Sequence, residues 1–159
     1  MLNLIEGKEN LKELDEFMKY KSVFDIIGPI MVGPSSSHTA GAVRIALYAR
    51  ELFAKRPTAV TITLYGSFAK TYKGHGTDVA LVGGLLNFQT DDERIPQALQ
   101  HAKEQGMKII FIASNEEPLH PNTVKLELTD GMETLEVVGV SIGGGKMRII
   151  KVGGEAYVS

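Results

Sequence analysis

The sequence predicts one α+β domain, with a mixed or mostly antiparallel β-sheet and helices packed on one of its faces. Segments with helical spacing come first, short segments rich in β-branched residues come later, and no linker or repeat divides the chain. The length of 159 residues and the hydrophobic content of 43% are ordinary for a single globular domain with one core.

Four segments have the spacing of amphipathic helices. They cover residues 2–20, 39–55, 78–88 and 95–106. Gly83 and Gly84 lie inside the third segment and allow close packing at some cost in helix stability. Pro96 suits the first turn of the fourth. The first segment is expected to form an N-terminal helix or tail within residues 1–20, so the domain itself is expected to cover residues 21–159.

Five segments have the character of β-strands. They cover residues 59–65, 107–113, 124–128, 134–140 and 147–152. Asp130-Gly131 separates the third and fourth of them and is a strong hairpin signal. Gly143-Gly144-Gly145 turns the chain into the last strand.

Composition narrows the partners and the compartment. A net charge of -2 and an aromatic content of 7% offer neither a basic patch nor stacking surfaces for nucleic acid. No apolar stretch approaches the roughly 20 residues of a membrane helix, and the first residues do not resemble a signal peptide, so we expect a soluble cytoplasmic protein. The sequence contains no cysteine, which excludes a thiol nucleophile and a thiolate-held zinc or iron-sulfur site built from this chain alone.

Three of the four histidines fall in predicted loops, and loops carry function more often than the interiors of helices and strands do. They are His38 in the loop 28–39, His75 in the loop 66–77 and His120 in the loop 115–122. The fourth histidine, His101, lies in the middle of a predicted helix, where exposure to solvent is the simplest explanation.

The run Ser35-Ser36-Ser37-His38-Thr39 precedes the second predicted helix. Ser36 or Ser37 suits the N-cap position, and capping alone would account for the run. The free N–H groups at a helix start, the positive end of the macrodipole and several hydroxyl groups also suit a carboxylate or phosphate. A P-loop is excluded because its Gly-Lys-Ser/Thr ending is absent.

The segment Lys73-Gly74-His75-Gly76-Thr77-Asp78 is at its simplest a polar turn into a helix capped by Thr77 or Asp78. Its glycines also let the imidazole of His75 approach a ligand closely, and the ordinary histidine pKa of about 6.5 suits a general base at neutral pH. His120 and Asn122 form either an Asx-turn before a strand or the polar rim of a cleft. The run 141–146 is a hairpin loop or a backbone surface against which a ligand or partner lies close.

Taken together, these loops resemble the β subunit of the bacterial iron-sulfur-dependent L-serine dehydratases, also called L-serine deaminases. The resemblance extends over about residues 20–152, and the order and spacing of the motifs make it specific. The matching motifs are Phe24-Asp25, Gly33-Pro34-Ser35-Ser36-Ser37-His38-Thr39, Tyr65-Gly66-Ser67, Gly74-His75-Gly76-Thr77-Asp78, His120-Pro121-Asn122-Thr123 and Ser141-Ile142-Gly143-Gly144-Gly145.

The resemblance implies an L-serine ammonia-lyase, a cytoplasmic lyase of serine catabolism and gluconeogenesis that converts L-serine to pyruvate and ammonia. It implies a 4Fe-4S cluster held by cysteines of an α subunit, with no metal held by this chain, and activity only in a homo-oligomer or heterotetramer that includes that subunit. His75 would remove the α-proton of serine. The implied substrate-binding residues are Ser35, Ser36, Ser37, His38, Thr39, His120 and Asn122. The fold would be similar to the allosteric substrate-binding domain of phosphoglycerate dehydrogenase, and the family's C-terminal ACT domain would be absent.

Two other functions fit parts of the pattern. A non-catalytic domain could use the same anion pocket to sense serine or another small acid, and a neighbouring gene for a cysteine-bearing partner would argue against it. A three-histidine zinc hydrolase is the second alternative, although its ligands would lie in three separate loops without a short His-x-x-x-His spacing. For the two-subunit enzyme we expect the loops around His38, His75 and His120 to converge on one face of the sheet, at a cleft that is open because its other wall belongs to the partner.

Overall fold

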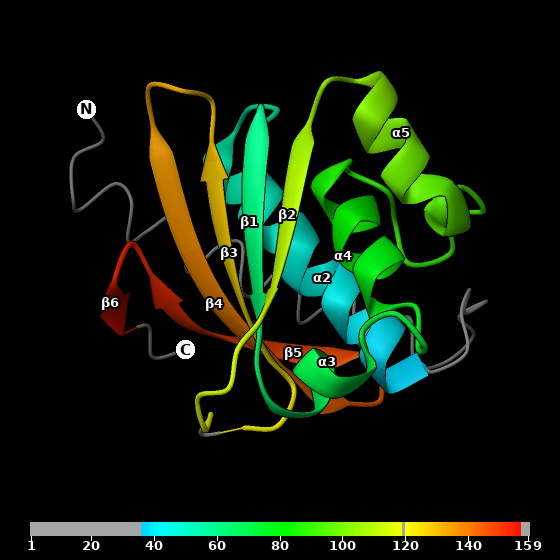
Figure 1. The fold of residues 1–159 in the computed structure, drawn as a ribbon, viewed down its shortest axis with the longest axis vertical. Helices are drawn as coiled ribbons and strands as arrows, with labels where there is room; N and C mark the ends of the chain where they lie inside the picture. The colour runs from blue at the N-terminus through cyan, green and yellow to red at the C-terminus, as the bar shows by residue number, and fades with distance from the viewer. Residues whose placement is uncertain (1–35, 119, 157–159) are drawn as a thin grey trace.

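The fold is a single six-stranded sheet with helices packed against it, described for residues 36–118 and 120–156 in a computed structural model (Figure 1). The strands lie in the order β2-β1-β3-β4-β5-β6. Their bounds are β1 Ala59–Leu64, β2 Lys108–Ala113, β3 Thr123–Thr129, β4 Thr134–Gly143, β5 Lys146–Val152 and β6 Glu155–Ala156. Only β1 and β2 are parallel, and the other neighbouring pairs are antiparallel. The predicted α+β class and the mostly antiparallel sheet are confirmed.

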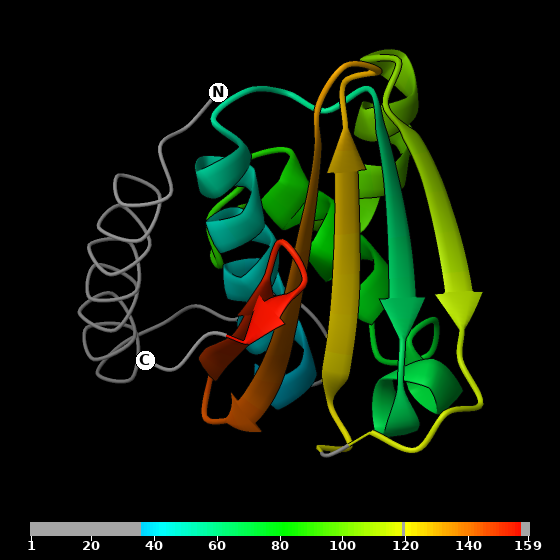
Figure 2. The same cartoon turned by 90° about the vertical axis from the view of Figure 1, so that its left-hand side faces the viewer.

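The helices are α2 Ser36–Phe53, α3 Gly66–Thr71, α4 Thr77–Leu85 and α5 Ala98–Glu104, with a 3-10 turn at Ile95–Gln97 before α5. The side view shows α2 and α4 on the same face of the sheet (Figure 2). The chain passes through α3, α4 and α5 between β1 and β2, a crossover of the kind that parallel neighbours require. The predicted helix at residues 2–20 lies outside the described residues.

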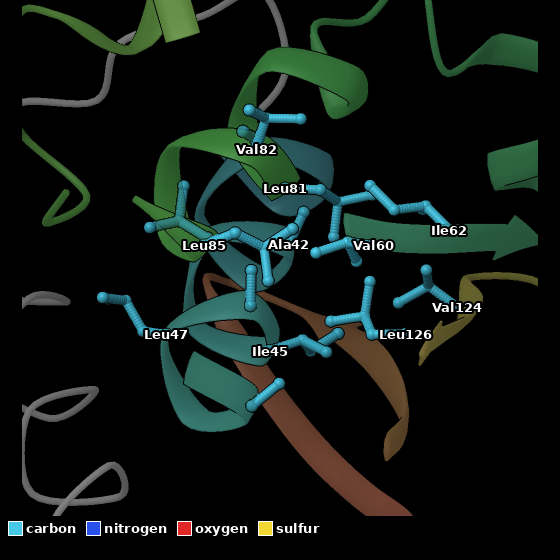
Figure 3. Close-up of a cluster of buried hydrophobic side chains, with 14 of the residues drawn as sticks. Ala42, Ile45, Leu47, Val60, Ile62, Leu81, Val82, Leu85, Val124 and Leu126 are labelled. Atoms are coloured by element: carbon cyan, nitrogen blue, oxygen red, sulfur yellow. The ribbon is translucent and has the colours of Figure 1, made fainter. Parts of the chain in front are cut away.

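The core lies between the sheet and the helices. Val60, Ile62 and Leu64 alternate along β1 toward the helices, and each is at most 1% exposed. This alternation is expected where one face of a strand packs on helices. Side chains from α2, α4 and β3 complete the cluster that Figure 3 shows, among them Ala42, Ile45, Leu81, Leu85 and Leu126. Full burial of a side chain of this size contributes roughly 1.5–3 kcal/mol.

Gly84 sets the close approach of α4 to α2. A Cβ atom at this position would lie 2.5 Å from the carbonyl oxygen of Val43 and 2.6 Å from the Cβ of Ala46. The neighbouring Gly83 differs, because the nearest atom to its Cβ would be the side-chain Cγ1 of Ile95 at 3.2 Å. The expected packing role of the two glycines is therefore strict at Gly84 and much weaker at Gly83.

Two predicted loops contain helix. Residues 36–39 form the first turn of α2, so Ser36 and Ser37 lie within the helix and the prediction that one of them is its N-cap is wrong. Serine is tolerated there because the first four N–H groups of a helix have no intrahelical partner. Residues 66–71 form α3, although their glycine and serine predict a loop. The side chain of Phe68 is fully buried and anchors this short helix to the core.

Candidate functional site

The segments that contain His38, His75 and His120 lie at the same end of the sheet, where β1 and β2 end and β3 begins (Figure 1, Figure 2). The first turn of α2, the turn between α3 and α4, the loop 114–122 and the turn between β4 and β5 all lie at this end. The segments thus gather at an end of the sheet and not, as the sequence predicts, on one of its faces. Ser35 and the side chains of Ser36, Ser37 and His38 lie outside the described part of the chain.

The loop before β3 is bound to the start of α3. The N–H of Ser67 donates to the carbonyl of Pro121 at 2.7 Å, and the N–H of Tyr65 donates to the carbonyl of Thr123 at 3.0 Å. Gly66 has a φ of 56° and a Cβ there would lie 2.6 Å from the Pro121 carbonyl oxygen, so a side chain is excluded for two reasons. Two motifs more than fifty residues apart are therefore parts of one structure.

His120 is half-buried, and its ring is oriented by the backbone. Its Nδ1 accepts a hydrogen bond from the N–H of Asn122 at 3.2 Å, and its carbonyl accepts one from the hydroxyl of Thr123 at 2.5 Å. A ring nitrogen that accepts must be unprotonated, so the proton of the neutral imidazole lies on Nε2. In this tautomer Nε2 presents an N–H donor to a ligand, and the lone pair of Nδ1 is engaged by the N–H of Asn122.

Asn122 connects this loop to β4 and has one unused polar atom. Its carbonyl accepts the N–H of Ser141 at 3.0 Å, and Ser141 is fully buried. A Cβ at Gly41 in α2 would collide with the Ser141 hydroxyl, so α2 also packs tightly at this point. The side-chain oxygen Oδ1 of Asn122 is buried without a hydrogen-bond partner. A buried acceptor without a partner has lost its hydrogen bonds to water, which destabilises the fold. The Oδ1 atom is therefore a candidate acceptor for a ligand.

His75 lies on the exposed turn between α3 and α4, and its backbone is held in place. Its N–H donates to the carbonyl of Thr71 at 3.0 Å. Gly76 follows in the left-handed conformation, with φ of 74°, and α4 starts directly after it. The backbone therefore presents the imidazole at the end of the domain.

No side chain caps α4, so the prediction that Thr77 or Asp78 does so is wrong. The hydroxyl of Thr77 is buried and has no partner, and the carboxylate of Asp78 accepts the N–H of Val79 at 2.8 Å. The cap position falls on Gly76, because the chain turns left-handed there. Burial raises the pKa of the Asp78 carboxyl above its ordinary value, which the hydrogen bond from Val79 partly opposes.

Arg44 is a buried charge that the sequence did not single out. It is 2% exposed, and its guanidinium donates to the carbonyl of Gly145 in the turn between β4 and β5. Gly145 has a φ of 76°, and a Cβ there would lie 2.7 Å from the guanidinium. The glycine-rich turn joins the antiparallel strands β4 and β5, so it is the hairpin loop that the sequence predicts as one of its two roles, and its backbone also packs on Arg44 of α2. Thr39, five residues before Arg44 in the same helix, is also buried, at 3% exposure.

A hollow of about 490 Å³ lies between α3 and the loop that precedes β3. Gly66, Ser67, Lys70 and Pro121 contribute to its lining. Among the residues that the structure describes, no three His, Cys, Asp or Glu side chains come together as a metal-binding group. Within the same residues, no helix is long and apolar enough to cross a membrane.

Comparison with known proteins places these features in a family. The model of the serine dehydratase beta chain family matches residues 22–107. The chain is 57% identical over 137 residues to the probable L-serine dehydratase beta chain of Bacillus subtilis (strain 168), an alignment that covers 86% of this chain and 62% of that protein. It is 49% identical over 138 residues to the L-serine dehydratase beta chain of Peptoniphilus asaccharolyticus, covering 85% of this chain and 62% of that protein.

A more distant relative is L-serine dehydratase 2 of Escherichia coli (strain K12), which is 38% identical over 104 residues. That alignment covers 60% of this chain and 22% of the E. coli protein. The chain spans less than two thirds of the length of the beta chains that it matches. By the family match and these identities, the chain belongs to the serine dehydratase beta chain family.

Proposed function

We propose that this chain is the β subunit of a cytoplasmic L-serine ammonia-lyase, which converts L-serine to pyruvate and ammonia together with an α subunit. The observation that carries the proposal is the gathering of the His75 turn, the His120 loop and the first turn of α2 at one end of the sheet. A base, an oriented N–H donor and a helix start are the groups that binding and deprotonating an amino acid require.

His75 is assigned the role of general base. The imidazole takes the proton from the α-carbon of serine and the bond from the β-carbon to the hydroxyl oxygen breaks. The departing hydroxide takes that proton back from the imidazolium, directly or through solvent, so that water leaves and His75 is neutral again. The product, 2-aminoacrylate, tautomerises to an imine, and water hydrolyses the imine to pyruvate and ammonia. His75 is assigned this role because its side chain is exposed at the end of the domain, whereas His120 is half-buried and its Nδ1 accepts a backbone hydrogen bond.

The remaining groups are assigned to substrate binding. The start of α2, with Ser35, Ser36, Ser37, His38 and Thr39, would hold the carboxylate of serine, because free N–H groups and the helix dipole favour an anion there. His120 would donate from Nε2. The unpartnered Oδ1 of Asn122 is an acceptor suited to the ammonium group of the substrate.

The iron-sulfur cluster is assigned to the α subunit. These 159 residues contain no cysteine, so they do not fit a thiolate-held cluster. The exposed position of His75 supports a site whose second wall belongs to another chain. The expected assembly contains both subunits, as a homo-oligomer of such pairs or a heterotetramer.

The proposal is tested by co-expressing this chain with the cysteine-bearing protein of a neighbouring gene, purifying the complex without oxygen and assaying pyruvate. We expect the two chains to co-purify and to release pyruvate and ammonia in equal amounts from L-serine. A complex that binds serine without consuming it would instead support the effector-binding alternative and contradict the proposed activity.

The serine-rich first turn of α2 has its own expected kinetic signature. In the assembled enzyme, Ser36→Ala should raise the KM for serine by roughly tenfold, which is the loss of one hydrogen bond to a charged group, and should change kcat less. The carboxylate of serine is charged in the bound substrate and in the transition state, so the enzyme binds it equally strongly in both. Loss of this contact therefore affects KM more than kcat. Thr58→Ala is the matched control, because its hydroxyl donates to Thr129 at the opposite end of the sheet. An unchanged KM with a large fall in kcat would assign Ser36 to the transition state.

A further inference from the structure

Strand β2 forms one edge of the sheet, and within the described residues no strand pairs with its outer side. The N–H groups of Lys108 and Ser114 donate inward, toward β1. Successive residues of a strand direct their peptide groups to opposite sides, so the N–H and C=O groups of Ile109, Phe111 and Ala113 point outward. Such a row of backbone groups is a template for another strand.

The two edges of the sheet differ in their protection. β2 contains no proline and no bulge, and its only charged residue is Lys108 at its first position. At the other edge, β6 has only two residues. The neighbouring β5 exposes Lys146, Arg148 and Lys151, and its pairing with β4 has two register shifts. Short strands, charges and bulges are the devices that prevent unwanted pairing, and β2 has almost none of them.

Apolar side chains lie on both sides of the unprotected edge. Leu99, Ile110 and Ile112 are 40%, 42% and 46% exposed, and they are three of the five large hydrophobic side chains exposed in the described part of the chain. Ile110 and Ile112 lie on the face that carries no helix. On the helix side, a groove of about 440 Å³ runs between α5 and β2, with Leu99 and Phe111 in its lining. Concentrated exposed apolar surface of this kind marks an interaction site.

We propose that this edge pairs with a second copy of the chain, so that two β2 strands run antiparallel about a two-fold axis and join two sheets into one. A two-fold axis normal to the sheet keeps the helices of both copies on the same side. Residues that face the same way must then lie opposite each other. The register that centres Phe111 on the axis places Ile109 opposite Ala113 and uses every outward-facing residue in hydrogen bonds.

Charge and side-chain pairing favour this occupant. Lys103 and Lys108 are exposed near the N-terminal end of β2, and Glu116 and Glu117 are exposed beyond its C-terminal end. An antiparallel copy brings the basic end of one strand to the acidic end of the other, whereas a parallel copy would bring like charges together. In the same register, Ile110 of one copy lies opposite Ile112 of the other.

The first test is the mass of the full chain by sedimentation equilibrium, alone and in the complex with the α subunit. The double variant Ile110→Lys and Ile112→Lys places like charges opposite each other, so the dimer dissociation constant should rise at least tenfold. Ile142→Lys is the matched control, because Ile142 is 44% exposed on β4, away from this edge. A wild-type chain that is monomeric, or an α subunit that covers β2 in place of a second copy, would overturn the proposal.

The second test fixes the register and does not depend on the charge variants. The sequence has no cysteine, so every disulfide between two copies of the chain must come from the introduced cysteines. Opposite residues in a pair without hydrogen bonds have Cα atoms about 4.5 Å apart, within the range of a disulfide. A mixture of Ile110→Cys and Ile112→Cys chains should therefore cross-link faster than either variant by itself. Equal cross-linking in all three samples would indicate random collision and contradict the pairing.

Discussion

Replacing His75 with alanine in the assembled enzyme should lower kcat and kcat/KM together by roughly 10²–10⁴-fold, with little change in the KM for serine. A general base acts in the transition state, so its loss removes little ground-state binding. The side chain of His75 is exposed and its backbone is held by Thr71, so the domain should still fold. Steady-state pyruvate formation at several serine concentrations measures both constants.

His101→Ala is the matched control for this experiment. His101 lies in α5, where its ring packs edge-on against Phe88 with centroids 5.8 Å apart. Its loss should cost about 0.5–1.5 kcal/mol of stability and leave kcat unchanged. If His75→Ala raises KM at constant kcat, His75 binds the substrate and is not the base.

Gly84→Ala should lower the free energy of unfolding by about 1–3 kcal/mol, the usual cost of overpacking a core. The added methyl group meets the backbone of α2, and α2 cannot shift without disturbing the core. Gly83→Ala is the matched control in the same helix, since its Cβ would meet a side-chain carbon of Ile95 at 3.2 Å and no backbone atom within 4 Å is among its nearest contacts. The higher helix propensity of alanine should make this variant equal to the wild type or up to about 1 kcal/mol more stable.

Urea unfolding of the full chain, followed by circular dichroism, measures both glycine variants. The comparison is internal, because the two substitutions are identical and the two positions are adjacent. Equal changes in the free energy of unfolding would mean that the contact between α2 and α4 is not as close as the structure has it.

The regular part of the fold is predictable from local patterns. The strands follow from β-branched residues, and the hairpin between β3 and β4 follows from Asp130-Gly131, whose carboxylate accepts the N–H of Met132 and Glu133. The short helix α3 is not predictable, because glycine and serine favour a loop, whereas the burial of Phe68 and the hydrogen bond from Ser67 to Pro121 depend on the folded chain. The first turn of α2 is not predictable either, because its serines also favour a loop.

The sequence predicts which residues belong to the candidate site, but it does not predict the contacts that those residues make. Glycine and proline beside His75 and His120 mark both histidines in the sequence. Their different roles depend on the hydrogen bond from Asn122 to Nδ1 of His120, which requires the folded loop. Arg44 was missed because a charged residue in an amphipathic helix normally faces solvent, whereas in the folded chain its guanidinium is buried and donates to the carbonyl of Gly145.

The central claim, that this chain supplies one wall of a serine site completed by an α subunit, is tested most directly by titration. Purified α subunit is held at a fixed concentration without oxygen, this chain is added, and the initial rate of pyruvate formation is recorded. We expect no rate for either chain alone and a rate that rises to a plateau at one equivalent. A rate from the α subunit alone that this chain does not increase would contradict the claim.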